Sequence, residues 1–529
     1  MGDRTALTAY IHARAAETAA PLDDAAAAYA AALTLTPDNE VLAQRAMRTG
    51  LWAGDEALAL RAAAILDRAG TINPEGRLLL AAEAVKAKRW PAAAAQADLI
   101  GKDEVFGFMA PVLRAWIAEG SGKGDPAAIL AAGSGERSPL AAYAAEQRAL
   151  LLVARGDKGL ALAAVQPVFA RADNRSDRVR LLLASQLAGR GWRAEAAELL
   201  QGDSAPIADA RARLAAGRPL PGPAPGAPAG IADFLVALAA DLSSQEVPDL
   251  ALSFSRIAGF LSPATSEAPM DAAELLAGRG QHEAALAALA GIPADDPYYA
   301  LAADRRLSFL NAAGRGEQAL AEARAAAAKA PGAVESWTRL GDLLTQNKRY
   351  GDAADAFAKA LAIPGDDPAN PRWILLVLRG NALTQAGRWP EAKASLEQAY
   401  ALAPRQPMVL NFLGYSQLER RENLPAATRL IEEASRRQPD DAAITDSLGW
   451  AYYVQGDAAK AVGLLERAAQ GQPADSAINE HLGDAYFSVG RRWEARYAWR
   501  AALVYAEGAA ADRLKAKIDT GLTPALAAP

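Results

Sequence analysis

Of the side chains that commonly perform enzyme chemistry, histidine is rare in this chain and cysteine is absent. Its three histidines, His12, His282 and His481, lie far apart without a metal-ligand spacing such as HExxH, so each is interpreted as structural. No cysteine is present, which excludes a thiol nucleophile and a cysteine metal site. The segment GSGKGD at 120–125 lacks the first glycine of a phosphate loop, since Ile117 stands there, and is interpreted as a turn.

Carboxylates are plentiful, and a pair facing each other across a helical cleft could act as general acid and base. The simpler interpretation places them on solvated helix faces. Neither a GxSxG nucleophile elbow nor a GxGxxG loop after a strand occurs in the sequence. We therefore expect no catalytic residue, no metal ion and no cofactor, and the remaining candidate residues depend on the helices that carry them.

A spaced pattern recurs five times in the C-terminal part of the chain. Each unit has a glycine on a first predicted helix, and the intervals between these glycines are 39, 34, 35 and 34 residues. A second predicted helix carries an alanine followed four residues later by a large apolar residue. A period near 34 built from two helices predicts a solenoid of helical hairpins. The repeated positions are Gly341, Gly380, Gly414, Gly449 and Gly483, with Ala353, Ala392, Ala427, Ala461 and Ala495.

The small residues of the pattern have a physical reason, because glycine and alanine let the two helices of a hairpin approach closely. We expect each glycine to face a small residue of the second helix, and the large residue to fill the gap to the next hairpin. Asp440, Asp441 and Asp475 lie where the following helices need an N-cap. The pattern resembles the tetratricopeptide (TPR) repeat. It predicts an all-α fold, a right-handed α-solenoid of TPR-like helical hairpins forming an open superhelix with a C-terminal capping helix.

The candidate binding site follows from this resemblance. In TPR hairpins the first helix lines the concave face, so the side chains at fixed positions of that helix form a groove. The mixture of aromatic rings, amides and carboxylates suits an extended peptide, although Trp450 and Tyr453 could instead pack between neighbouring hairpins. The predicted groove residues are Asp342, Asn381, Asn411, Tyr415, Asp446, Trp450, Tyr453, Glu480, Asp484 and Phe487.

The rest of the chain is predicted to form more degenerate hairpins. We expect TPR-like hairpins over 1–215 and 231–333, five clear TPR units over 334–508, and a capping helix with a frayed tail over 509–529. The capping helix should present Asp512, Arg513, Lys515 and Lys517 on its outer face. Residues 216–230, with five prolines, cannot be helical on this interpretation and form either a linker or a packed strap.

Composition and charge limit the classes of partner. The chain is 51% hydrophobic but only 6% aromatic, as expected for alanine-rich, closely packed helices. A net charge of −6 argues against nucleic acid, since phosphate binding needs a basic stripe. No run of 18 apolar residues occurs, so we expect no membrane span, and the start MGDRTALTAY is not a signal peptide. The oligomeric state is left open.

Residues 371–506, including the segment VLNFLGYSQLERRENLPAATRLIEEA, are similar to a proteobacterial family of cell-envelope TPR proteins, often lipoproteins. That family includes the adaptor that presents peptidoglycan hydrolases to a carboxyl-terminal processing protease. The resemblance implies a non-enzymatic scaffold with protein partners, located in the periplasm or attached to the outer membrane, with a cytoplasmic location as the alternative. No signal peptide and no lipid-bearing cysteine are visible in the sequence.

Two other functions stay open. The first is an enzyme with a helical toroid, which would need its first and last hairpins to meet and its carboxylates to converge on one cavity. The second is a subunit for assembly of envelope polysaccharide. A capped, open spiral favours the adaptor or scaffold that binds protein partners in its groove.

Overall fold

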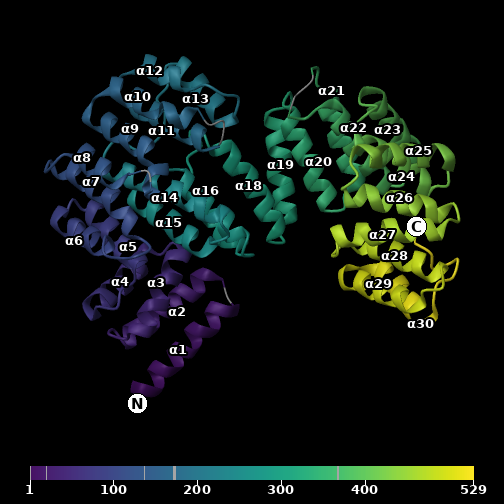
Figure 1. Cartoon of the computed structure of the whole chain (residues 1–529), viewed down its shortest axis with the longest axis horizontal. Helices are drawn as coiled ribbons and strands as arrows, with labels where there is room; N and C mark the ends of the chain where they lie inside the picture. Colours follow the sequence, from purple (N-terminus) through teal and green to yellow (C-terminus); the bar gives the residue numbers. More distant parts are fainter. Residues whose placement is uncertain (1, 20, 136, 171–173, 366–368, 529) are drawn as a thin grey trace. The chain divides into compact units, whose positions relative to one another are not determined.

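The computed structural model describes residues 2–19, 21–135, 137–170, 174–365 and 369–528, which form thirty α-helices and two short 3-10 helices (Figure 1). Consecutive helices pair as hairpins, and neighbouring hairpins stack on one another. This arrangement confirms the all-α solenoid of TPR-like hairpins. The chain divides into two compact units, Met1–Arg315 (unit 1) and Gly316–Pro529 (unit 2), between α18 (Tyr299–Ala312) and α19 (Gly316–Lys329).

Unit 1 starts with six hairpins and continues with helices that pack back onto them. Its hairpins are α1 (Gly2–Ala19) with α2 (Leu22–Leu35), α3 (Glu40–Ala53) with α4 (Glu56–Ala69), α5 (Pro74–Lys86) with α6 (Trp90–Ile100), α7 (Ala110–Ser121) with α8 (Pro126–Gly133), α9 (Ala144–Arg155) with α10 (Lys158–Phe169), and α11 (Asn174–Gly189) with α12 (Arg193–Leu199). The helices that follow are α13 (Ala205–Ala215), α14 (Ala227–Ser244), α15 (Pro248–Leu261), α16 (Glu267–Ala277), α17 (His282–Leu289) and α18.

Unit 2 holds the five clear repeats. After α19 the hairpins are α20 (Val334–Gln346) with α21 (Tyr350–Ala362), α22 (Arg372–Gln385) with α23 (Trp389–Leu402), α24 (Pro407–Glu419) with α25 (Leu424–Arg437), α26 (Ala442–Val454) with α27 (Ala458–Gly471), and α28 (Ser476–Ser488) with α29 (Arg492–Tyr505), and α30 (Gly508–Thr520) packs on α29. Two of the three predicted N-caps are present. Asp441 accepts a hydrogen bond from the backbone N–H of Ile444 at 2.9 Å, and Asp475 does the same for Ile478 at 3.0 Å. Asp440 precedes the first of them and is not the cap residue.

Each repeat glycine lies directly against the large residue of its own second helix. A Cβ added to Gly449 would come within 2.7 Å of Leu465 Cγ, and one added to Gly483 within 2.4 Å of Trp499. The expectation that the glycine faces only a small residue is therefore wrong, although at Gly414 the carbonyl oxygen of Ala427 is as near as Ile431, at 2.8 Å. The large residue also packs towards the next hairpin, as expected, since Ile431 shares a cluster with Leu448 and Leu465 shares one with Leu482. The large side chain closes the hairpin itself, and only the missing Cβ leaves room for it. The same contact joins Gly341 to Phe357, Gly380 to Leu396 and Gly414 to Ile431.

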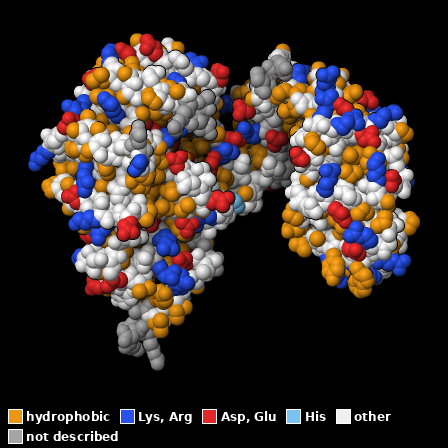
Figure 2. Space-filling view, viewed as in Figure 1, with side chains coloured by type: hydrophobic (Ala, Val, Ile, Leu, Met, Phe, Trp, Pro, Cys, Tyr) orange, Lys and Arg blue, Asp and Glu red, His pale blue; other side chains and the backbone are white. Residues whose placement is uncertain are grey.

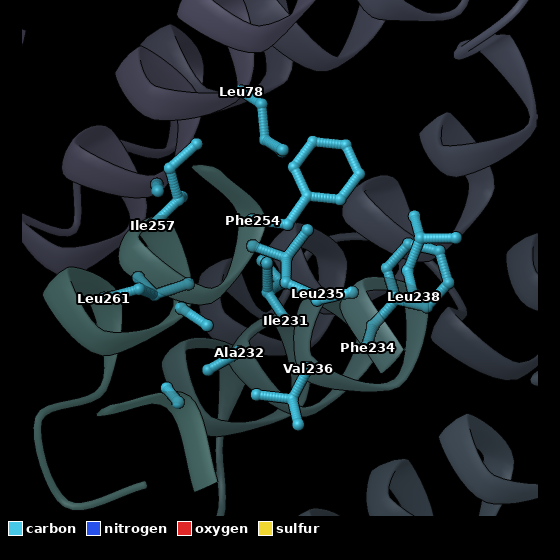
Figure 3. Close-up of a cluster of buried hydrophobic side chains, with 14 of the residues drawn as sticks. Leu78, Ile231, Ala232, Phe234, Leu235, Val236, Leu238, Phe254, Ile257 and Leu261 are labelled. Atoms are coloured by element: carbon cyan, nitrogen blue, oxygen red, sulfur yellow. The ribbon is translucent and has the colours of Figure 1, made fainter. Parts of the chain in front are cut away.

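In unit 1 the hairpin α14–α15 occupies the concave side of the solenoid. Helix α14 packs on α5, α7 and α9, and α15 packs on α3 and α5, all first helices of their hairpins. The ring of Phe234 meets Tyr143 edge-on at 5.3 Å, and a Cβ on Gly230 would come within 2.0 Å of Trp116. Figure 3 shows the apolar cluster that α14 and α15 form with Leu78 of α5.

Helix α14 is long and apolar enough to cross a membrane by length and composition. In the structure, however, 67% of its residues are buried inside the protein. Its one buried acid, Asp233, accepts a hydrogen bond from Gln147 at 2.8 Å and pairs with Arg178. Gln147 in turn accepts from the indole N–H of Trp116 at 2.7 Å. These contacts identify α14 as the core helix of unit 1.

The proline-rich stretch lies inside unit 1 and is packed along 220–223. Leu220, Pro221 and Pro223 line a small cavity together with α11 side chains, and Gly222 has φ 147° with no space for a Cβ beside Ser185. The expectation that the whole of 216–230 is non-helical is wrong, because α14 begins at Ala227. Proline at position 228 is compatible with the first turn of a helix, where its missing N–H would have no partner in any case.

The capping helix α30 differs from its prediction. Arg513 and Lys517 do not form an outer polar face, since both pair with α28 and Lys517 is fully buried. The tail is not frayed as far as Ala528, whose side chain is buried among residues of α24–α27. Both differences have one cause. Glu480 and Asp484 of α28 accept hydrogen bonds from Arg513, Lys517 and Ala528, and these contacts fix α30 and the C-terminal residues against unit 2.

The contact between Gly449 and Leu465 can be tested with a single methyl group. We expect Gly449→Ala to lower the free energy of unfolding by about 1–3 kcal/mol, because the added methyl group would overlap the fully buried Leu465. Gly463 on α27 is the matched control, since a Cβ there meets nothing within 4 Å. Gly463→Ala should raise stability by about 0.5–1 kcal/mol. Urea titration followed by circular dichroism measures both, and equal stabilities would contradict the register of the repeat.

Candidate functional site

The ten predicted groove residues lie on the first helices of unit 2, from α20 to α28. Those on α26 and α28 are mostly buried, with Asp446, Trp450, Glu480 and Asp484 each less than a tenth exposed. Those on α20, α22 and α24 are half-buried: Asp342, Asn381, Asn411 and Tyr415. Tyr453 and Phe487 are also half-buried. The face therefore has a closed end at α26–α28 and a more accessible part at α20–α24.

An aromatic stack forms the centre of the closed end. The Trp450 ring lies between Tyr453, with ring centroids 4.6 Å apart, and His481 of the next first helix, at 4.0 Å. His481 Nδ1 is 3.0 Å from both carboxylate oxygens of Asp446. Burial alone would lower the pKa of His481, but the carboxylates around it, Asp446 first and then Asp484 and Glu480, together outweigh burial and raise that pKa. Tyr415 of α24 packs against the same cluster.

A charged network lies beside this stack and ties α30 to α28. Glu480 accepts two hydrogen bonds from the guanidinium of Arg513, both at 2.7 Å, and one from Lys517 at 2.6 Å. Lys517 also donates to both oxygens of Asp484, at 2.7 and 2.8 Å. The lysine therefore joins two buried carboxylates, an arrangement that is stable only while its partners stay in place.

The pKa values of the two acids in this network, Glu480 and Asp484, are shifted in opposite directions. Burial favours the neutral form of Glu480, but Arg513 and Lys517 outweigh it and lower the pKa of that carboxyl. Burial dominates at Asp484 and raises its pKa despite the neighbouring Lys517. Asp484 also accepts hydrogen bonds from the Trp499 indole at 2.9 Å and from the backbone N–H of Ala528 at 2.9 Å. Its carboxylate therefore has a fixed orientation.

The accessible part of the face is polar. Asn381 on α22 and Asn411 on α24 present half-buried amides on adjacent first helices. Asp342 on α20 lies next to Arg339, yet burial prevails and raises the pKa of Asp342 to about 6. On the visible side of the described residues, Figure 2 shows acidic and basic side chains interspersed on each unit rather than in one basic stripe.

The structure thus brings Tyr415, Asp446, Trp450, Tyr453, Glu480, Asp484 and Phe487 to one end of the face, and leaves Asp342, Asn381 and Asn411 along the rest of it. Sequence reasoning missed four participants: His481, Arg513, Lys517 and Ala528. One signal was available for Lys517, which follows the buried Leu514 by three residues and so shares its helix face.

Comparison with known proteins supports the repeat assignment. The family model described as "Tetratricopeptide repeat" matches residues 311–371, 377–427 and 417–477. A TPR repeat-containing protein of Pseudomonas aeruginosa, PA4667, is 29% identical over 158 residues, which is 30% of this chain and 26% of that protein. The match therefore spans about a quarter of the curated relative. The chain carries tetratricopeptide repeats, and these repeats indicate a scaffold for protein–protein interaction.

Solved TPR structures match parts of the chain. The protein TTC0263 of Thermus thermophilus is 24% identical, with a TM-score of 0.31, over 36% of this chain and 98% of that one. YrrB, described as a TPR protein with an unusual peptide-binding site, is 21% identical, with a TM-score of 0.26, over 33% of this chain and 87% of its own.

The buried lysine can be tested against an exposed one on the same helix. We expect Lys517→Met to destabilise unit 2 by about 3–5 kcal/mol, because Glu480 and Asp484 would remain buried without their shared cation. Lys515 pairs with Asp512 at the surface, so Lys515→Met should change stability by no more than about 0.5 kcal/mol. Urea unfolding, with hydrogen exchange of α30 as a local readout, compares the two. Equal effects would show that Lys517 is not buried in solution.

The pair of His481 and Asp446 makes stability depend on pH. Because the pKa of His481 is raised in the folded protein, the pair stabilises it fully below the unfolded pKa of about 6.5. This contribution is lost as the pH rises through the folded pKa. The stability difference between wild type and His481→Gln should therefore shrink with rising pH, by about 1–3 kcal/mol for a charge-assisted hydrogen bond. Urea titrations across that range measure it, and parallel curves would contradict the assignment.

Proposed function

We propose that unit 2 binds an extended segment of a partner protein on its concave face. The observation that carries the proposal is the pair of half-buried amides, Asn381 and Asn411, on neighbouring first helices. An amide side chain both donates and accepts hydrogen bonds, as does each non-proline residue of an extended peptide backbone. Tyr415, close to Asn411 on α24, adds an aromatic surface for apolar side chains of the ligand.

Unit 2 is the better candidate for this function than unit 1. The concave side of unit 1 is already filled by α14 and α15, whose apolar side chains form the core there. A partner could reach those first helices only by removing a core hairpin. In unit 2, by contrast, α20, α22 and α24 present half-buried polar side chains on the equivalent face.

The same geometry supports a non-enzymatic scaffold over the toroidal enzyme. Acid–base chemistry needs two carboxylates that are available to a substrate. Glu480 and Asp484, two acids of the closed end, are instead bound by Arg513 and Lys517. We therefore assign these carboxylates to the attachment of α30.

The finer role follows from the resemblance of residues 371–506 to envelope TPR proteins. We propose an adaptor in the periplasm, or attached to the outer membrane, that presents envelope proteins to a carboxyl-terminal processing protease. The resemblance alone supports this role and this location. The binding of an extended segment by α22 and α24 does not depend on either.

Peptide binding can be tested without knowing the natural partner. Peptides selected from a random display library on the full chain should bind Asn381→Ala and Asn411→Ala between about three- and tenfold more weakly, the loss expected for one hydrogen bond. Gln470→Ala is the matched control, since Gln470 is an exposed amide on α27, a second helix. Fluorescence anisotropy measures the affinities. Selected peptides that bind all three variants as tightly as wild type would place the site elsewhere.

A further inference from the structure

We infer that the closed end of the unit 2 concave face is a binding site for a short peptide of small apolar residues, and that residues 522–528 are its intramolecular occupant. This inference rests on the proposed function, because it names the ligand chemistry at one end of the same face. The occupant is visible in the structure. The segment leaves α30 and runs back towards α26, as the yellow end of the chain in Figure 1 shows.

The first anchor of the segment lies at α28. Leu522 packs into the cluster that contains Tyr453 and Phe487. Gly521, just before it, has φ 87° and lies so close to Phe487 that an added Cβ would be 3.0 Å from the ring. The predicted groove residue Phe487 thus lies against the start of this segment, and Tyr453 belongs to the same cluster as Leu522.

The second anchor is Ala528, which reaches the hairpins α24–α25 and α26–α27. Its side chain is buried in the cluster that contains Leu418, Leu448 and Trp450. Its backbone N–H donates to Asp484 at 2.9 Å. Because Lys517 and the Trp499 indole hold Asp484 in place, this carboxylate is a preformed acceptor for a peptide N–H. The site therefore requires a backbone N–H at this position, which a proline could not supply.

Between the anchors the segment is held weakly. Thr523, Pro524 and Ala525 are exposed, and a turn closes there through a hydrogen bond from the N–H of Leu526 to the carbonyl of Thr523 at 2.9 Å. Two short anchors separated by an exposed turn contrast with α14–α15 of unit 1, most of whose residues are buried. The segment is accordingly a displaceable competitor, and a partner with the same two anchors takes its place.

The test uses a labelled peptide with the sequence of residues 521–528, GLTPALAA, blocked at both ends, and the full chain. In wild type the attached segment competes at an effective concentration on the order of 1 mM. Ala528→Glu would bury a carboxylate in the apolar cluster of Leu418, Leu448 and Trp450 and should therefore release the segment. We expect this variant to bind the peptide at least about tenfold more tightly than wild type. Ala525→Glu, which changes an exposed residue of the same segment, should bind it as wild type does.

The peptide itself provides a second test of specificity. A peptide with Ala528→Pro lacks the N–H that Asp484 accepts, and should bind the Ala528→Glu chain at least about tenfold more weakly than the parent peptide. A peptide with Ala525→Ser should bind like the parent. Hydrogen exchange of residues 522–528 reports release of the segment, and circular dichroism reports that the repeats stay folded.

Three outcomes would overturn the inference: equal peptide binding by wild type and Ala528→Glu, equal binding of the proline peptide, or unchanged hydrogen exchange of the segment in Ala528→Glu. Either of the first two outcomes would show that the closed end does not bind the peptide. The third would show that the contacts of Ala528 do not hold the segment in place. None of them concerns Asn381 or Asn411. If library peptides still depend on those amides, the proposed function stands alone. If Ala528→Glu binds the GLTPALAA peptide more tightly while Asn381→Ala and Asn411→Ala bind library peptides normally, the closed end is the binding site. The amides of α22 and α24 then do not contribute to binding.

Discussion

The structure of unit 2 depends on one steric constraint, the absence of a Cβ where a large second-helix side chain lies. At Gly341, Gly380, Gly414, Gly449 and Gly483 an added Cβ would come within 2.8 Å of the large residue of the same hairpin, and no other residue type leaves room for it. The contact sets the separation of the two helices in every repeat. Because the hairpins are alike, their first helices present side chains at a constant period on one face, which is why polar and aromatic groups of distant repeats form a single surface.

The two units use the equivalent face for different purposes. In unit 1 it is part of the core, where α14 brings the buried Asp233 to Arg178 and Gln147. In unit 2 this face carries half-buried amides on α22 and α24, and the ion network of α28 and α30 lies at its other end. The charges of that network are structural, since Arg513 and Lys517 together balance Glu480 and Asp484 and hold α30 on the last hairpin. A surface suited to protein partners is therefore bounded at one end by groups that hold the fold together.

The sequence predicted those features that repeat along the chain and missed those that join distant segments. A period of 34 residues was enough to predict the hairpins, and the N-caps Asp441 and Asp475 followed from local helix chemistry. The inward orientation of Arg513 and Lys517 was not predicted, because it depends on acids some 33 to 37 residues earlier. The position of Ala528 depends on Asp484, 44 residues before it, and no local pattern encodes that contact. The filling of unit 1 by α14–α15 was missed for the same reason.

The hairpin α14–α15 also makes the two units mechanically unlike. Its contacts join residues far apart in sequence, such as Arg256 and Trp52, which are 204 residues apart. Unit 2 is held mainly by contacts between neighbouring hairpins, so a force applied to its ends can detach them one at a time. The part of unit 1 from α3 to α9 cannot open in this way, since its first helices all pack on α14 or α15. The chain therefore combines an extensible array of repeats with a part that resists tension until its central helix is withdrawn.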